Sequence, residues 1–268
     1  MALALVAVAS GPAERADAAE RSVRIAVKGD WGWGGDAQAR VTRRLCREHD
    51  RSPFAFVLTT GDNFYRPDGR ATVSNWGRPE RCVRRAGLRY VAAWGNHDVR
   101  GSATADLLGA KRRWYRVRRG PAEVIVLDAN RPSHPAQMRF LRRALAAPPR
   151  GVRIVAMHQP VYAAGLHAGS AVQQRLWAPL FRREGVTLVL QGHNHAYERI
   201  QRDGLTYITT GGGGSPVYPC IRLEQGLRRC LPTHHFLALS VAPHAVSVRV
   251  VAPTGKTLER IRIPSRGR

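Results

Sequence analysis

Hydrophobic and polar positions change their spacing along the chain. Short apolar runs predict buried strands at 23–27, 54–58, 88–93, 124–127, 152–157 and 186–190. Between these runs, apolar residues at helical spacing predict helices at 36–48, 138–145 and 173–183. From Leu205 onward strands dominate, at 205–209, 236–241 and 246–251. This order favours an α/β protein, with packed sheets, helices outside them and a β-rich C-terminal end.

Five short polar motifs each follow a predicted strand. They are Gly29-Asp30-Trp31-Gly32, Gly61-Asp62-Asn63-Phe64-Tyr65, Gly95-Asn96-His97-Asp98, Met157-His158-Gln159-Pro160 and Gly192-His193-Asn194-His195. Because α/β sheets place their functional loops after the strands, we expect these side chains to meet at one edge. The glycine run from Gly211 to Gly214 also follows a strand and predicts a tight loop close to the same site.

The motifs together offer more metal ligands than one ion can use. The candidate ligands are two Asp, one Tyr, one Asn and three His: Asp30, Asp62, Tyr65, Asn96, His158, His193 and His195. Oxygen donors suit hard cations, and imidazole suits zinc or iron. A single Asp after a strand is more often a cap or turn residue. Five motifs in this order instead predict two ions side by side, with the Asp62 carboxylate as the natural bridge.

The motifs resemble those of the calcineurin-like metallophosphoesterase superfamily. Many of its members begin with Asp-x-His, whereas this chain has Asp30-Trp31-Gly32 and carries Tyr65 three positions after Asp62. That paired difference resembles the purple acid phosphatases, in their small single-domain form. Asp98 departs from the pattern, since those proteins usually carry Glu there. The resemblance implies a sandwich of two mixed β-sheets flanked by helices.

The resemblance also implies a role for each candidate residue. Asp30, Asp62, Tyr65 and His195 would hold Fe(III), and Asp62 with Asn96, His158 and His193 would hold a divalent iron, zinc or manganese ion. His97 would contact the phosphate, and His167, nine positions after His158, would assist as an acid or phosphate contact. The alternatives are a packing histidine for His97 and an exposed loop histidine for His167.

The implied reaction is cleavage of a phosphate monoester by metal-bound hydroxide, as in an acid phosphatase. One alternative is a phosphodiesterase that acts on nucleotides, nucleic acid or lipid head groups. Another is a non-catalytic module that binds phosphate or a polyanion. The complete ligand set disfavours this last alternative, because a decayed site would be expected to lack some ligands.

The chain is strongly basic, with 43 Lys+Arg against 19 Asp+Glu and a net charge of +24. This charge favours a phosphorylated small molecule or an anionic polymer as substrate. The alternative is a compositional bias toward Arg, because the basic residues are spread along the chain. We predict no obligate nucleic-acid partner. No apolar stretch reaches the ~18–20 residues of a membrane span, and the oligomeric state is left open.

The N-terminal segment resembles a secretory signal, with an apolar stretch at 1–10 and small residues near Ala18 and Ala19. It lacks the usual positive start. We therefore expect residues 1–20 to be a signal peptide or disordered, and 21–268 to be one catalytic domain. The protein would be secreted or extracytoplasmic, or cytoplasmic if this segment is not a signal. Cys46 could pair with Cys82 and Cys220 with Cys230, but four cysteines allow three connectivities.

Overall fold

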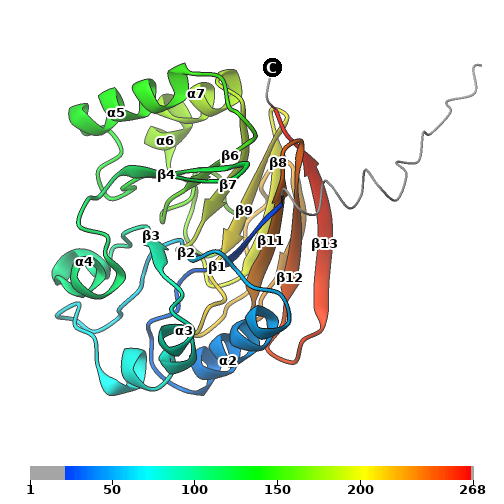
Figure 1. Ribbon diagram of the computed structural model, residues 1–268. Helices are drawn as coiled ribbons and strands as arrows, with labels where there is room; N and C mark the ends of the chain where they lie inside the picture. The colour runs from blue at the N-terminus through cyan, green and yellow to red at the C-terminus, as the bar shows by residue number, and fades with distance from the viewer. Residues whose placement is uncertain (1–21, 267–268) are drawn as a thin grey trace, which may run out of the picture.

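A computed structural model describes residues 22–266 of the chain. Two mixed β-sheets face each other, and helices cover their outer faces, as Figure 1 shows. One sheet has the strand order β13-β12-β11-β1-β2-β3, and the other has the order β10-β8-β9-β7-β6-β5-β4. This arrangement confirms the predicted α/β sandwich and its β-rich C-terminal end. The expected signal peptide lies outside the described residues.

The strands are β1 (Val23–Lys28), β2 (Val57–Thr59), β3 (Tyr90–Ala92), β4 (Tyr115–Arg119), β5 (Ala122–Val126), β6 (Val152–Ala156), β7 (Val186–Gln191), β8 (Tyr197–Arg202), β9 (Leu205–Thr210), β10 (Leu227–Leu231), β11 (Phe236–Ala242), β12 (Ala245–Val251) and β13 (Thr257–Pro264). The helices are α2 (Asp36–Arg51), α3 (Arg81–Arg85), α4 (Ala103–Leu108), α5 (Pro135–Ala146), α6 (Ala171–Leu176) and α7 (Ala178–Arg183), with a π-helical turn η1 (Val73–Gly77) and a 3-10 turn η2 (Asp98–Arg100).

The main core lies between the two sheets, where the strands bury one face against each other. A second cluster packs α5, α6 and α7 on the outer face of the larger sheet. A third packs α2 and α3 on the outer face of the other sheet. Because central strands are buried on both faces, they read as continuous apolar runs, and this is why the sequence predicts them well.

The predicted boundaries fail where the chain is amphipathic or interrupted. The predicted helix at 173–183 is two short helices, α6 and α7, and Pro179 stands in the first turn of the second. Proline lacks the N–H that a continuous helix needs there. The strands β4, β8, β10 and β13 were not predicted. β4 and β13 are edge strands rich in exposed Arg, so they lack the apolar run of a central strand.

Two disulfides join the four cysteines. Cys46 on α2 bonds to Cys82 on α3, and Cys220 bonds to Cys230 on β10. Of the three connectivities that the sequence left open, the structure has this one. Both bonds fit an oxidising compartment. Within residues 22–266, every helix is too short or too polar to cross a membrane.

A buried ion pair lies below the end of β1. The Lys28 ammonium donates to Glu80 at 2.6 Å, and both side chains are fully buried. Tyr90 donates to the same carboxylate at 2.6 Å, and Thr42 donates to its other oxygen at 2.9 Å. The ammonium also lies over the Trp31 ring, 4.0 Å from its centroid. This network joins α2, α3 and β3 to the strand that leads into Asp30.

We expect Glu80→Gln to destabilise the protein by about 3–5 kcal/mol, because it leaves the Lys28 charge buried without a counter-ion. Urea unfolding of the oxidised protein measures the change. The exposed pair Arg183–Glu184 provides the control: Glu184→Gln should cost about 0–1 kcal/mol. Adding Lys28→Met to Glu80→Gln should restore part of the loss. A double variant less stable than Glu80→Gln alone would contradict this account.

Candidate metal centre

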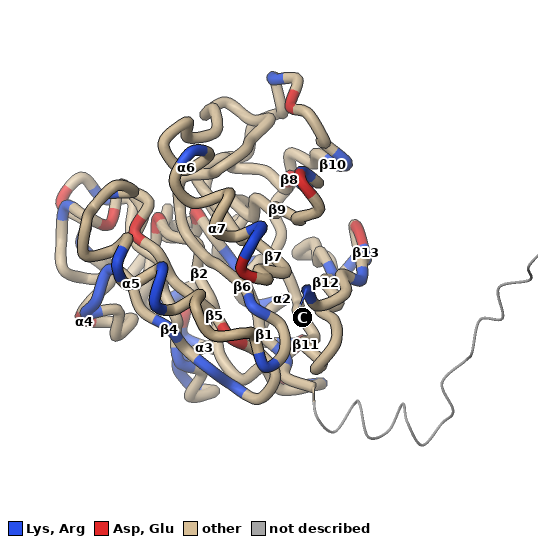
Figure 2. The backbone as a smooth tube through the Cα atoms, turned by 90° about the horizontal axis from the view of Figure 1, so that it is seen from above, with Lys and Arg blue, Asp and Glu red and all other residues tan. Residues whose placement is uncertain are grey.

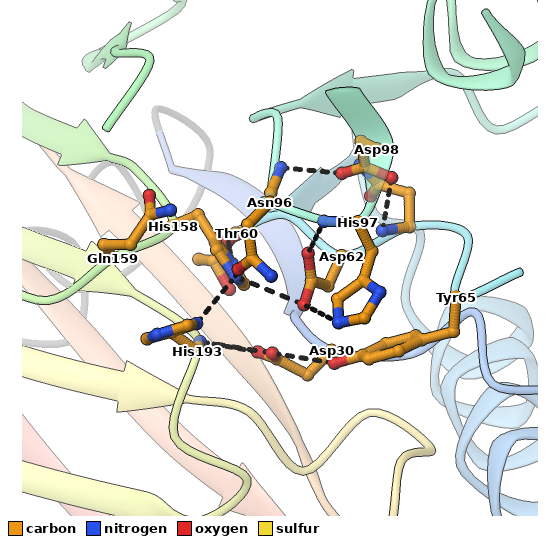
Figure 3. Close-up of polar contacts among 12 residues, drawn as sticks. Asp30, Thr60, Asp62, Tyr65, Asn96, His97, Asp98, His158, Gln159 and His193 are labelled. Carbon is orange, nitrogen blue, oxygen red and sulfur yellow. Dashed lines mark hydrogen bonds and ion pairs between the residues drawn. The ribbon is translucent and has the colours of Figure 1, made fainter. Parts of the chain in front are cut away.

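The five motifs meet at one end of the two sheets. Figure 3 shows side chains from each of the five motifs gathered at this end, among them Asp30, Asp62, Asn96, His158 and His193. Asp30, Asp62 and His193 have φ angles of 55°, 50° and 71°. Such left-handed backbone is uncommon for residues other than glycine, and it persists only where surrounding contacts enforce it. Three of the seven predicted ligands are thus held in conformations that the local sequence alone would not favour.

Asp30, Tyr65 and His195 form the first donor cluster. The Tyr65 hydroxyl lies 3.1 Å from Asp30 Oδ1 and 2.9 Å from His195 Nε2. His195 Nε2 lies 3.5 Å from Asp30 Oδ1. The three atoms therefore converge on one small volume. A phenol oxygen, a carboxylate and an imidazole form a donor set suited to iron.

Asp62, Asn96, His158 and His193 form the second donor cluster. Three atoms face the single nitrogen His158 Nε2: Asn96 Oδ1 at 3.0 Å, His193 Nδ1 at 3.2 Å and Asp62 Oδ2 at 3.3 Å. One N–H cannot satisfy three acceptors together, whereas a cation between them can. Among the described residues, Asp62, His158 and His193 are the one group of His, Cys, Asp and Glu with metal-ligand spacing.

Backbone carbonyls orient two of the histidines. His158 Nδ1 lies 2.9 Å from the Thr60 carbonyl, and His195 Nδ1 lies 2.8 Å from the Pro216 carbonyl. A carbonyl can only accept, so Nδ1 donates in both rings. Each Nε2 is then left for the centre, the arrangement found around metal-binding histidines. Neither carbonyl partner is apparent from the motifs themselves.

Two glycines allow the loops to approach the ligands closely. A Cβ atom at Gly95 would lie 2.0 Å from Asp62 Oδ1, and one at Gly211 would lie 3.0 Å from Asp30 Oδ2. Any side chain at Gly95 would therefore displace the Asp62 carboxylate. The position of Gly211 confirms that the glycine run forms a tight loop at the site.

Asp98 ties the second and third motifs together, a role that the sequence did not reveal. Its carboxylate accepts from Asn63 N at 2.9 Å, Phe64 N at 3.1 Å and Gly95 N at 2.7 Å. The Asn63 side-chain amide adds a further bond at 2.9 Å. Burial raises the pKa of Asp98 to about 6. Asp98 therefore braces the loops that carry Asp62 and Asn96.

The two histidines predicted to contact phosphate occupy different positions. His97 donates its backbone N–H to Asp62 Oδ1 at 3.0 Å, and its ring lies 4.5 Å from the Tyr65 ring. His167 is exposed, and its ring lies 4.0 Å from the His193 ring. Partial desolvation lowers the pKa of both rings. The two rings border the donor clusters from different loops, His97 beside Tyr65 and His167 beside His193.

Sequence reasoning missed three other residues of the site. The Trp33 ring is 53% exposed and lies 5.3 Å from Tyr65. The Tyr218 ring lies 4.9 Å from His195, and its hydroxyl donates to the His193 carbonyl. Asn194 accepts from His167 N at 2.8 Å and donates to His167 O at 2.9 Å. Asn194 stood inside a motif and offered a signal, whereas Trp33 and Tyr218 follow no readable spacing.

The ionisable side chains of the site shift one another's pKa values. Burial raises the pKa of Asp30 to about 8, against the attraction of His158. Burial alone would lower the pKa of His158, but the carboxylates Asp62 and Asp30 raise it to about 9. Burial and the charge of His158 lower the pKa of His193 to about 3. His158 and Asp62, 3.3 Å apart, therefore stabilise each other's charged forms.

Glu198 supports the His167 loop from β8. It accepts from Ala164 N at 2.9 Å, and burial raises its pKa to about 7. A carboxyl with a raised pKa favours folding while it is protonated. Its contribution is complete below about pH 4.5, the unfolded value, and is lost as the pH rises through 7.

We expect Glu198→Gln to remove this pH dependence, which corresponds to about 3 kcal/mol. Urea unfolding of both proteins between pH 4.5 and 8 measures the effect. The wild type should lose stability relative to Glu198→Gln as the pH rises. Parallel stability curves for the two proteins would contradict the prediction.

The fold and the two donor clusters define the class of the protein. The chain belongs to the calcineurin-like phosphoesterase family, whose model matches residues 23–197, a range that includes all nine predicted site residues. It is therefore a metal-dependent hydrolase of phosphoric esters.

Among individual proteins, the chain is similar to acid phosphatases. Tartrate-resistant acid phosphatase type 5 of Oryctolagus cuniculus is 26% identical, and the alignment covers 94% of each chain. A purple acid phosphatase from yellow lupin seeds has a TM-score of 0.73 at 17% identity, over 91% of this chain and 54% of its own. GAP50, described as the anchor in the inner membrane complex of Plasmodium, has a TM-score of 0.76 at 18% identity, over 91% and 89%. These comparisons confirm the resemblance inferred from the motifs.

Proposed function

We propose that the protein is a dinuclear phosphomonoesterase of the purple acid phosphatase type. The observation that carries the proposal is the pair of donor clusters, one built around Tyr65 and one around His158. The similarity to acid phosphatases over nearly the whole chain supports it.

In this proposal each cluster would hold one ion. Asp30, Asp62, Tyr65 and His195 would hold Fe(III), and Asp62, Asn96, His158 and His193 would hold a divalent iron, zinc or manganese ion. The donor chemistry fits these ions, since hard oxygen donors gather around Tyr65 and imidazoles around His158. When bound, such a pair of ions activates water at mild pH and stabilises charge on phosphate oxygens.

The chain's own residues position the ester and neutralise its charge. His97 borders Asp62 and Tyr65, where its ring can donate to a phosphate oxygen. His167 lies against His193 at the exposed rim, where it can protonate the leaving oxygen. The Asn194 side chain forms hydrogen bonds with both the backbone N–H and the carbonyl of His167. These bonds hold His167 near the proposed ligands, and a general acid must be held within reach of the group that it protonates.

Turnover of a matched pair of esters tests the proposal. The metal-loaded protein should hydrolyse p-nitrophenyl phosphate faster than bis(p-nitrophenyl) phosphate. Both esters release the same phenol, so their rates can be compared directly. The reverse preference would identify a phosphodiesterase. Failure to hydrolyse either ester with both ions bound would support the non-catalytic alternative.

We further propose that the protein acts outside the cytoplasm, with residues 21–268 as its catalytic domain. The two disulfides support this location, because such bonds persist in oxidising compartments. The natural substrate is then a phosphorylated small molecule or an anionic polymer. Mass spectrometry of the exported protein from its native source, with the N-terminal residue determined, tests the location.

A further inference from the structure

A groove opens along one edge of the sandwich, away from the proposed ligands. The strand β3 ends one sheet and β4 ends the other, so the mouth between them has no further strand to close it. The groove encloses about 800 Å³. The Tyr115 hydroxyl donates to the Ala92 carbonyl at 3.0 Å and joins the two sheet edges at this mouth. A volume of this size lies within the range of about 300–1,000 Å³ typical of small-molecule sites.

The floor of the groove is apolar. Phe56 and Val91 of the main core line it, together with Val117, which packs against that core, and Leu88 of the third cluster. Val117 is only partly buried, although it packs against that core. A groove occupant with an apolar segment would remove this surface from water, which is favourable in proportion to the area covered.

The rim of the groove is basic. Arg84, Arg89, Arg118 and Arg119 line it, and Asp106 is the one acidic residue among the lining residues. Figure 2 shows Lys and Arg gathered over α3 and β4. Arg118 pairs with Glu123 at 2.8 Å. Within residues 22–266, Arg89 and Arg119 make no ion pair, so two guanidinium groups are left for an anion.

We propose that this groove binds a single-chain anionic amphiphile, of which a long-chain fatty acid is the simplest example. Its alkyl chain would lie along Phe56, Val91 and Val117, and its carboxylate would meet the guanidinium groups of Arg89 and Arg119. A purely polar anion would leave the apolar floor uncovered. A second copy of this chain would bring the same Arg residues together, and charged edge strands hinder such pairing.

The site is separate from the metal centre. Its lining residues include neither the seven proposed ligands nor His97 and His167. Binding in the groove therefore does not depend on the function proposed for the metal centre. Hydrolysis of a phosphate monoester by the same preparation reports on the metal centre alone.

Titration of the full-length protein with cis-parinaric acid, a fluorescent fatty acid, tests the proposal. We expect saturable binding of one molecule per chain, displaced by palmitate and not by the uncharged hexadecanol. Arg89→Glu should weaken binding about tenfold or more, the effect of losing one charge-assisted contact. Val117→Ser should also weaken binding, because it replaces an apolar side chain of the groove floor that would contact the alkyl chain.

Arg85→Glu is the matched control. Arg85 is exposed on α3, four positions before Arg89, but it does not line the groove. Both variants change the net charge equally, so Arg85→Glu should leave the affinity within about twofold. Equal weakening by the two variants would overturn the proposal, because it would indicate general attraction to a basic protein. Unsaturable binding, displacement by hexadecanol, or a dimer that covers the groove would also overturn it.

Discussion

Replacing Asp62 by alanine is expected to abolish phosphomonoester hydrolysis. Loss of one transition-state donor typically costs about 10²–10³ in turnover. Asp62 is proposed to serve both ions and also accepts from His97 N at 3.0 Å, so the loss should exceed ~10³-fold. The same variant should retain less metal. Steady-state kinetics and elemental analysis of one preparation measure both effects.

Asp68→Ala provides the control for this prediction. Asp68 lies in the same loop region and is exposed, and its ion-pair partners within residues 22–266 are the neighbouring Arg66 and Arg70. Its replacement should leave turnover and metal content at wild-type levels. If Asp62→Ala kept both ions and turned over substrate like the wild type, the proposed bridge would be wrong.

Tyr65→Phe is expected to remove the visible absorption of the iron-loaded protein. A phenolate bound to ferric iron would give the protein its colour, and only the hydroxyl differs in the variant. That hydroxyl lies within 3.1 Å of Asp30 and 2.9 Å of His195. Absorption spectra of the two proteins, with iron measured in the same samples, should show the band in the wild type alone.

Tyr218→Phe is the matched control. The Tyr218 ring also lies beside His195, but its hydroxyl donates to the backbone carbonyl of His193. This variant should keep the absorption band. A colourless wild-type protein that binds zinc or manganese at both positions would refute the iron assignment. A two-metal phosphoesterase with Tyr65 as a neighbour would then remain.

The sequence by itself predicted the parts of the fold that depend on local pattern. Strands such as β1, β6 and β7 are buried on both faces, so their apolar runs stand out from the surrounding chain. The motifs follow such strands, and this position identified the seven candidate ligands. In the structure these candidate ligands lie together, as expected for motifs that each follow a strand.

Features that depend on distant segments could not be predicted in this way. The Arg-rich edges β4 and β13 carry no apolar run, because one side of each strand faces solvent. Asp98 looked like a minor departure from a motif, yet it accepts from residues 34 and 35 positions away. Its partners exist only once the loops have come together.

The sequence thus determined the central strands, the candidate ligands and the phosphoesterase class, since each follows from residue type and short-range spacing. The tertiary structure decided the disulfide pairing, the carbonyls that orient His158 and His195, and the place of Tyr218 beside the site. It also decided where the two sheets end and leave a basic groove. These features arise from contacts between segments far apart in the chain, and local pattern carries no record of them.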